Sequence, residues 1–593
     1  MALVNRSTRL RMRRILRRRQ RQVEAAAQEF DVHVIGRFDR FVRVRRFALG
    51  WLTLTVLLTF CTIIQTVNLS AYYQRTEPVP GGIYDEGMVG TYTNANPIYA
   101  TGSVDQAVSR LIFAGLMQYN DQNKLVPDLA SSYTVDPSGR HYVFKLKPGL
   151  TWQDGQPLTA QDVVYTYRLI QNPNAGSPFL QSWQNINVTA PNDLTVDFDL
   201  PNAFAAFPYS LVSGILPEHI LKNVPASQLR SDDFNTTDPV GAGPFGWQAI
   251  QASLGTDPSK ALSLIALKPF IHYNGGAPKL QGFVLHVFGG QQEMIQAFQS
   301  RQIIAMAGLN SVPSEVSKDS DLNVMSFNST AAMMTFFKTS DGVLADTDVR
   351  QALVQGADTT EIMNQLGYVT TPVREPLLMG QLGYNPQYQQ SSYNPSSANA
   401  LLESDGWVRG SGGIRSKNGQ QLTFGLYAED TPENDKTVAT LVKDWRALGV
   451  LANPILQSPT DFQTTLAFHN YDALLYGISI GVDPDVFPYW DSSQADVRST
   501  SQLNFSEYKN PVADASLEAG RTRLDPALRV IKYQPFLQAW QSDAPALGLY
   551  QPRILYVTRG TVYGLTDHTL NTDSDRYGSI TEWEIHTAKV TDK

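Results

Sequence analysis

The chain has 593 residues, a net charge of −7 and a single cysteine, Cys61. The charge is unevenly divided: residues 1–46 hold 14 Arg, no Lys and four acids, a net charge of +10, whereas residues 47–593 carry −17. The acidic part argues against nucleic-acid binding, which needs basic surfaces, and one cysteine excludes an intramolecular disulfide. The roughly 520 residues after the apolar run described next are too many for one hydrophobic core, so we expect two or three lobes.

Residues 47–69 form an uncharged apolar run directly after the Arg-rich arm. As a helix, these 23 residues are about 35 Å long, enough to cross a hydrocarbon core of about 30 Å. Positive charge on one flank predicts a cytoplasmic arm and an extracytoplasmic C-terminal part. A cleaved signal peptide fits less well, because the run is long and Leu69-Ser70-Ala71 is a poor cleavage site. We therefore expect a single-pass membrane protein, with a linker at residues 70–80.

The arm itself has three interpretations. It could bind the anionic inner leaflet, where each Arg contributes about 1 kcal/mol, it could contact a cytoplasmic partner, or it could serve only as a topology signal. Residues 23–30 could continue a helix along the membrane surface.

The remaining sequence interleaves helix and strand patterns. Apolar residues at helical spacing predict a helix within residues 105–117, and alternation predicts strands at 142–146 and 194–200. Thr159 and Asp162 have the spacing of a capping box that opens a helix. Further helices are expected at residues 347–357, 396–404, 433–448 and 525–543. This interleaving favours an α/β architecture.

Several motifs in a fixed order resemble the peptide/nickel-type extracellular solute-binding proteins of family 5, the receptors of ABC importers. They lie at residues 94–97 (NANP), 125–130 (LVPDLA), 142–147 (YVFKLK), 152–163 (WQDGQPLTAQDV), 241–245 (GAGPF), 348–352 (DVRQA), 393–402 (YNPSSANALL), 406–407 (GW) and 483–484 (DP). Together they cover essentially residues 80–585.

The resemblance implies a periplasmic-binding-protein-like clamp of two lobes with an additional small domain, closing reversibly over a ligand. Its implied division is lobe I at residues 81–117, 238–329 and 548–593, domain II at 118–237, and lobe III at 330–547. Closure about a hinge would give a permease a shape to recognise.

The resemblance also implies where the ligand lies. We expect contacts from six residues: Asn96, Tyr119, Tyr476, Ile480, Asp483 and Trp490. In relatives that bind peptides, an acidic residue a few positions before the Asp-Pro pair captures the ligand's α-ammonium, and an ungapped match places Ile480 there. Since a buried ammonium needs a counter-charge, either Asp483 or Asp485 takes this role or the ligand lacks a free amino terminus.

One short pattern suggests a different chemistry. Ser479 stands at the centre of a G-x-S-x-G pattern, the nucleophile elbow of hydrolases, and Asp485, Asp567 and His568 could complete a triad. Pro484 argues against the helix that must follow such a serine. A strand with two glycines at a cleft edge is the simpler interpretation.

Two further patterns are weaker still. Residues 241–246 match the G-x-G-x-x-G of dinucleotide sites, but Pro244 and a turn-like lead-in disagree with the strand and helix that such a site needs. Asp483 and Asp485 could form half of a cation site, without a further acidic cluster at ligand spacing.

The sequence thus predicts a membrane-anchored receptor, not an enzyme, with no cofactor and no metal. Its expected partners are a peptide or other polar solute, ABC permease and ATPase subunits, and the membrane through residues 47–69, with a monomeric ectodomain and no nucleic acid. The alternatives are the same fold binding a non-peptide solute, a sensor or interaction module, and, more remotely, an anchored serine hydrolase using Ser479.

Overall fold

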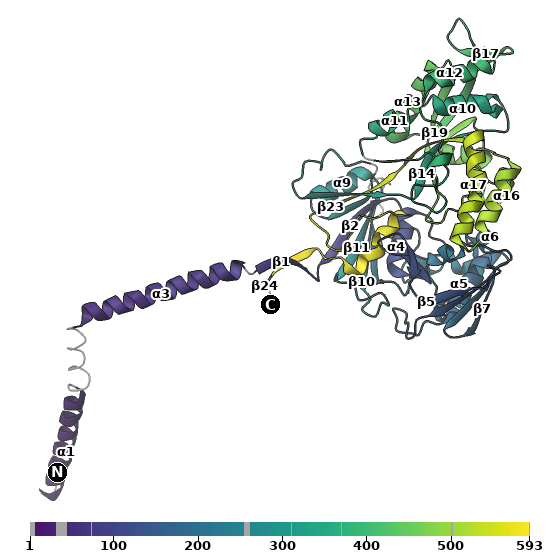
Figure 1. Ribbon diagram of the computed structural model, residues 1–593. Coiled ribbons are helices and arrows are strands. Elements are labelled where there is room, and N and C mark those ends of the chain that lie inside the picture. The colour runs from purple at the N-terminus through teal and green to yellow at the C-terminus, as the bar shows by residue number, and fades with distance from the viewer. Residues whose placement is uncertain are drawn as a thin grey trace. The chain divides into compact units, whose positions relative to one another are not determined.

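The computed structural model describes residues 6–30, 44–72, 74–253, 261–309, 311–368, 370–499 and 502–591. The chain divides into two compact units: residues 1–78 with 587–593, and residues 79–586. We call the second unit the body (Figure 1).

The first unit consists mainly of two helices, α1 (Arg6–Phe30) and α3 (Arg45–Tyr72). Strand β1 (Gln74–Val79) follows and pairs with β24 (His586–Thr591). The expected linker at residues 70–80 therefore contains the end of α3 and a short strand.

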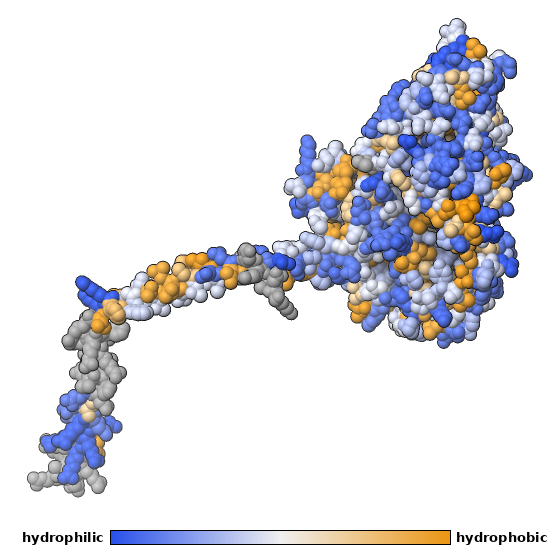
Figure 2. Space-filling model, viewed as in Figure 1, coloured by the Kyte–Doolittle hydropathy of each residue, from blue (hydrophilic) through white to orange (hydrophobic). Residues whose placement is uncertain are grey.

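Helix α3 contains the apolar run. Among the described residues, Arg45–Leu69 is the one helical stretch long and apolar enough to cross a membrane, and Figure 2 shows hydrophobic residues along it and hydrophilic ones along α1. Its threonine hydroxyls donate to carbonyls one turn back, as Thr55 does to Trp51 at 2.8 Å. These bonds satisfy the threonine hydroxyls within the helix itself.

The body contains a seven-stranded sheet of order β13-β23-β12-β2-β11-β10-β9. Its strands are β2 (Ile83–Val89), β9 (Phe245–Ser253), β10 (Leu262–Pro269), β11 (Gly282–Phe288), β12 (Ala305–Leu309), β13 (Leu322–Asn328) and β23 (Arg553–Arg559). The central strand β2 runs parallel to both of its neighbours. Helices α4 (Ser103–Ile112) and α9 (Gln291–Gln299) and the 3-10 segment η9 (Asp573–Glu582) accompany this sheet.

A four-stranded antiparallel sheet of order β5-β6-β8-β7 is formed within residues 130–199. Its strands are β5 (Ala130–Val135), β6 (His141–Leu146), β7 (Asn187–Asn192) and β8 (Thr195–Asp199), and a hairpin of β3 (Met117–Tyr119) and β4 (Leu125–Pro127) precedes them. The helices here are α5 (Ala160–Gln171), α6 (Leu180–Trp183), α7 (Glu218–Leu221) and α8 (Ala226–Leu229). The capping box predicted at Thr159 and Asp162 is confirmed at the start of α5.

A six-stranded sheet of order β15-β22-β14-β21-β19-β20 forms the upper part of the body in Figure 1. Its strands are β14 (Ala331–Phe337), β15 (Thr371–Pro372), β19 (Thr423–Glu429), β20 (Leu451–Gln457), β21 (Ala473–Ser479) and β22 (Ala546–Gln551), and β16 (Val408–Arg409), β17 (Arg415–Lys417) and β18 (Gln420–Gln421) form a small separate sheet. The helices are α10 (Thr347–Gln355), α11 (Thr359–Gln365), α12 (Pro395–Ser404), α13 (Pro432–Ala447), α14 (Pro459–Phe468), α15 (Phe487–Trp490), α16 (Pro511–Arg521) and α17 (Pro526–Asp543). The helices and strands predicted from periodicity are thus confirmed to within a few residues, except that α4 ends at Ile112 instead of near residue 117.

Burial separates these sheets into two lobes. One continuous hydrophobic cluster joins the seven-stranded and four-stranded sheets, from Tyr84 through Trp152 to Trp583. Two other clusters contain residues of the six-stranded sheet and its helices, with Trp445 in one and Trp540 in the other. The four-stranded sheet therefore shares its core with one lobe, and the six-stranded sheet forms the other.

The chain crosses between the two lobes at adjacent points. Ser329 and Thr330 connect β13 to β14, and Pro552 connects β22 to β23. Ser329 N donates to Pro552 O at 3.3 Å, and the Gln551 side chain donates to Ser329 O at 3.0 Å. Two short neighbouring connections are the arrangement that hinge closure needs. The lobe boundaries expected from the sequence stay predictions, with β22 ending at Gln551, beyond the expected crossing at residue 547.

Candidate ligand-binding cleft

A cavity of about 680 Å³ lies where segments of both lobes meet, and we call it the main cavity. From the lobe of the six-stranded sheet come residues 378–382, residues 481–484 and the start of α17. From the other lobe come residues 122–123, Tyr209 and Thr569, and the crossings add Thr330 and Gln551. A cavity of this size and placement is typical of a site that encloses a small ligand.

The two charged residues that line the main cavity pair with each other. Arg529 donates to both carboxylate oxygens of Asp483 at 2.7 Å and to Gly520 O at 3.2 Å. Both residues are buried, at 5% and 8% exposed. Burial lowers the pKa of Arg529, but the bond to Asp483 outweighs it and raises the pKa overall. The pair is therefore charged and internally compensated.

Asp485 is compensated as well. Burial raises the pKa of its carboxyl, and Arg521 counters this through an ion pair at 2.9 Å. Asp483 and Asp485 are the two carboxylates of which either could replace the ammonium anchor missing at position 480, the alternative being a ligand without a free amino terminus. Each already has an arginine partner, so neither offers a free negative charge to a ligand.

The wall formed by residues 378–382 is held by an amide. Gln381 accepts from Leu378 N at 2.7 Å and donates to Gly481 O at 2.7 Å. The Gln381 side chain thus links the loop after β15 to the loop after β21, and residues of both loops line the main cavity.

Of the six predicted contact residues, Asp483 lines the main cavity and Tyr119 lines a second cavity of about 260 Å³. Asn96 is fully buried, and its amide donates to the Asn235 side chain at 2.9 Å. Trp490 is also fully buried, against Phe336 and Trp540.

Tyr476 and Ile480 also lie on the six-stranded lobe. The Tyr476 ring packs against Phe462 and Phe505, and Ile480 is 7% exposed, with its backbone N donating to Thr330 O at the crossing. The six contacts remain predictions, with only Asp483 and Tyr119 lining the two cavities. The sequence gives no local signal for Arg529, because it meets Asp483 only through the fold.

The nucleophile-elbow pattern lacks the required structure. Strand β21 ends at Ser479, Gly481 follows with φ of 78°, and the next helix begins only at Phe487. His568 Nδ1 contacts Thr566 O at 2.8 Å, and Asp485 pairs with Arg521. In the described residues, these contacts disagree with the triad that a nucleophile elbow would need, in line with the simpler interpretation of a strand with two glycines.

The glycine-rich pattern at residues 241–246 has a packing role. A Cβ on Gly241 would lie 2.0 Å from Ile112 O, so only glycine fits this close approach. The segment continues into strand β9 instead of a helix, which disagrees with a dinucleotide site.

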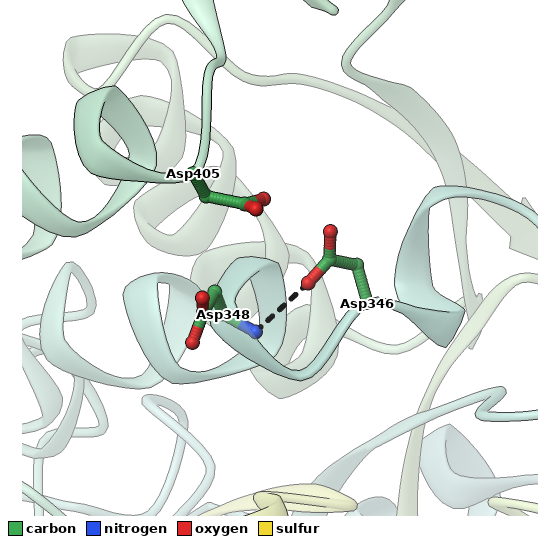
Figure 3. Close-up of side chains that lie close together, drawn as sticks. All are labelled: Asp346, Asp348 and Asp405. Atoms are coloured by element: carbon green, nitrogen blue, oxygen red, sulfur yellow. Dashed lines mark hydrogen bonds between the residues drawn. The ribbon is translucent and has the colours of Figure 1, made fainter.

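Three carboxylates, Asp346, Asp348 and Asp405, lie close enough to suggest a cation (Figure 3). The ammonium of Lys417 contacts Asp405 at 2.7 Å and Asp346 at 3.3 Å. Asp346 also caps α10, accepting from Asp348 N at 3.0 Å. Lys417 and the start of α10 thus provide partners for two of the three carboxylates, Asp346 and Asp405.

Comparisons with known proteins agree with this architecture. The family model of bacterial extracellular solute-binding proteins, family 5 middle, matches residues 124–499. The oligopeptide-binding protein AppA of Bacillus subtilis (strain 168) is 24% identical over 516 residues, which cover 84% of this chain and 92% of AppA.

Solved structures show the same fold. NikZ from Campylobacter jejuni, in complex with Ni(L-His), has a TM-score of 0.72 at 23% identity and covers 85% of this chain and 99% of its own. AppA from Bacillus subtilis, in complex with a nonapeptide, has a TM-score of 0.68 at 22% identity and covers 86% and 100%. These two proteins hold different ligands, so the fold by itself does not select one.

Proposed function

Because this chain belongs to the bacterial extracellular solute-binding proteins of family 5, we propose that its body captures a peptide between the two lobes and delivers it to an ABC importer. The observation that carries this proposal is the main cavity, which is lined by segments of both lobes beside the two chain crossings. The naming of AppA as an oligopeptide-binding protein, and its structure with a nonapeptide, support a peptide as the ligand. The receptor binds and releases its ligand unchanged.

We further propose that α3 anchors this receptor, with the Arg-rich arm in the cytoplasm. The support is an apolar stretch at Arg45–Leu69 with positive charge on one flank only. Protease added outside intact cells should then remove the body and leave the arm protected. Cleavage of the arm under these conditions would contradict the orientation.

The peptide proposal is tested with the full chain purified in detergent. Mass spectrometry should find peptides that co-purify, and a pool of synthetic nonapeptides should bind in equilibrium dialysis. Thr569→Trp fills the main cavity, so we expect it to weaken binding at least about 10-fold, the effect of roughly 1.4 kcal/mol. Thr566→Trp is the matched control, because Thr566 is exposed and lies outside the cavity.

Two results would contradict the proposal. One is a co-purified metal chelate, sugar or lipid without any peptide. The other is peptide binding that Thr569→Trp leaves unchanged, which would place the ligand elsewhere.

A further inference from the structure

The second cavity, of about 260 Å³, lies beside the main cavity, and we call it the Arg110 pocket. One face of α4 forms a wall with Arg110 in its last turn, and residues 571–575 form another. Phe113, Phe179 and Val212 give it an apolar part.

The Arg110 pocket and the main cavity are separated by single side chains. Tyr119 lines the pocket, and its ring centre is 6.4 Å from that of Tyr209, which lines the main cavity. Asn571 of the pocket exchanges hydrogen bonds with two main-cavity residues, donating to Asn123 at 2.8 Å and accepting from Thr330 at 2.9 Å. A ligand that fills the main cavity therefore has one end close to this pocket.

Charge in the Arg110 pocket is unpaired. Within the described residues, the Arg110 guanidinium makes no hydrogen bond or ion pair. The other charged lining residue is Asp575, one of whose oxygens accepts from Asn571 N at 3.2 Å and Thr572 N at 3.0 Å, while the second oxygen has no partner in the described residues.

A buried carboxylate lies near Arg110 without binding it. Asp128 is fully buried and accepts from the Asn274 amide at 3.1 Å and the Tyr273 hydroxyl at 3.4 Å. Burial raises the pKa of the Asp128 carboxyl, and the charge of Arg110 opposes this at longer range. The five N–H donors of the guanidinium stay available to the pocket.

We propose that Arg110 anchors the C-terminal carboxylate of the peptide, an inference that rests on the proposed function. A guanidinium binds a carboxylate through two parallel N–H···O bonds. The free oxygen of Asp575 accepts the N–H of the last peptide unit, which lies a few bonds from that carboxylate. Among the described residues that line the main cavity, Asp483 is the one acid and it pairs with Arg529, so no acid there is free for an α-ammonium and recognition depends on the carboxyl end.

The test compares one pool of synthetic nonapeptides in three forms: free ends, acetylated N-termini and amidated C-termini. The full chain in detergent should bind acetylated and free peptides alike and amidated peptides about 10-fold more weakly, as for a lost charged hydrogen bond. Arg110→Gln should abolish this difference by weakening only the peptides with a free carboxylate.

Arg168→Gln is the matched control, because Arg168 also lies in the last turn of a helix, α5, but is exposed and lines no part of either cavity. Arg110→Lys keeps the charge and should retain part of the discrimination, provided that thermal unfolding shows both variants to be folded.

The outcomes separate the two proposals. If none of the pools binds, the peptide function fails. If the pools bind but amidation has no effect, or if Arg110→Gln keeps the discrimination, the role of Arg110 is overturned and the peptide function stands.

Discussion

The two lobes differ in whether the charged side chains beside the cleft have partners within the protein. On the six-stranded lobe, Asp483 pairs with Arg529 and Asp485 pairs with Arg521, so both of these carboxylates have a counter-charge within the protein. On the other lobe, Arg110 stands in a cavity without a partner among the described residues. Unpaired charge in a partly buried place costs stability and marks sites where a ligand supplies the partner.

Glu375, which follows β15, is a third acid on the six-stranded lobe. It is fully buried, and in the described residues it has one hydrogen bond, accepted from Asn385 N at 3.0 Å, while its second carboxyl oxygen has no partner. Burial raises the pKa of its carboxyl to about 8, although the Asn385 bond opposes this. At pH 7 the carboxyl is therefore mostly protonated, and Glu375 itself adds little negative charge to the six-stranded lobe.

The largest expected effect comes from breaking the compensated pair. Arg529→Met leaves Asp483 buried without a counter-charge, which should lower the free energy of unfolding by about 3–5 kcal/mol. The free energy of unfolding is measured on the full chain in detergent by urea titration, with tryptophan fluorescence as the signal. Arg110→Met, the matched change on the other lobe, should cost less than about 1 kcal/mol, because no internal pair is lost.

The double variant Asp483→Asn with Arg529→Met controls for lost packing and should recover most of the stability. If Arg529→Met and Arg110→Met lowered the free energy of unfolding equally, the distinction between a structural ion pair and a ligand-binding charge would be lost.

Features that depend on neighbouring residues could be predicted from the sequence, whereas features that depend on contacts between distant residues could not. The capping box at Thr159 and the helices after residue 347 follow from local patterns, which the structure keeps. Asp483 was expected at the ligand site, but its partner Arg529 lies 46 positions away, and no local rule links them. Trp490 could not be assigned for another reason, because an aromatic side chain suits a core as well as a cavity wall. In the structure Trp490 is fully buried in the core.

The free energy of unfolding should also depend on pH through Glu375. Unfolded Glu375 releases its proton near pH 4.5 and the folded group near pH 8. The folded state therefore binds more protons in this interval, and the free energy of unfolding falls as pH rises through it. Glu375→Gln keeps the neutral shape and should raise the thermal midpoint at pH 9 by at least about 3 °C, with little change at pH 4.5.

Glu315→Gln, at an exposed position, should show no such pH-dependent gain. A gain from Glu375→Gln that is the same at pH 4.5 and pH 9 would contradict the raised pKa of Glu375, and this carboxyl would then be a free charge on the six-stranded lobe.

The smallest expected effect, a change in peptide affinity, concerns a contact between the two lobes. The guanidinium of Arg521 lies 5.0 Å from the ring centre of Phe204, which follows the four-stranded sheet, and 4.1 Å from that of Phe487 on its own lobe. Ala205 N donates to Arg521 O at 2.9 Å. The arginine that compensates Asp485 thus also joins the two lobes in this arrangement.

Phe204→Ala removes one ring and leaves the ion pair intact, so it tests the contact alone. Since an exposed cation–π contact contributes about 0.5–1 kcal/mol, peptide affinity should fall about 3-fold and the ligand-free chain should scatter X-rays as a larger particle. Phe468→Ala, which removes a ring 70% exposed to solvent, should change neither quantity. Unchanged affinity and scattering in Phe204→Ala would mean that Arg521 serves only Asp485, so that the paired charges of this lobe take no part in closure.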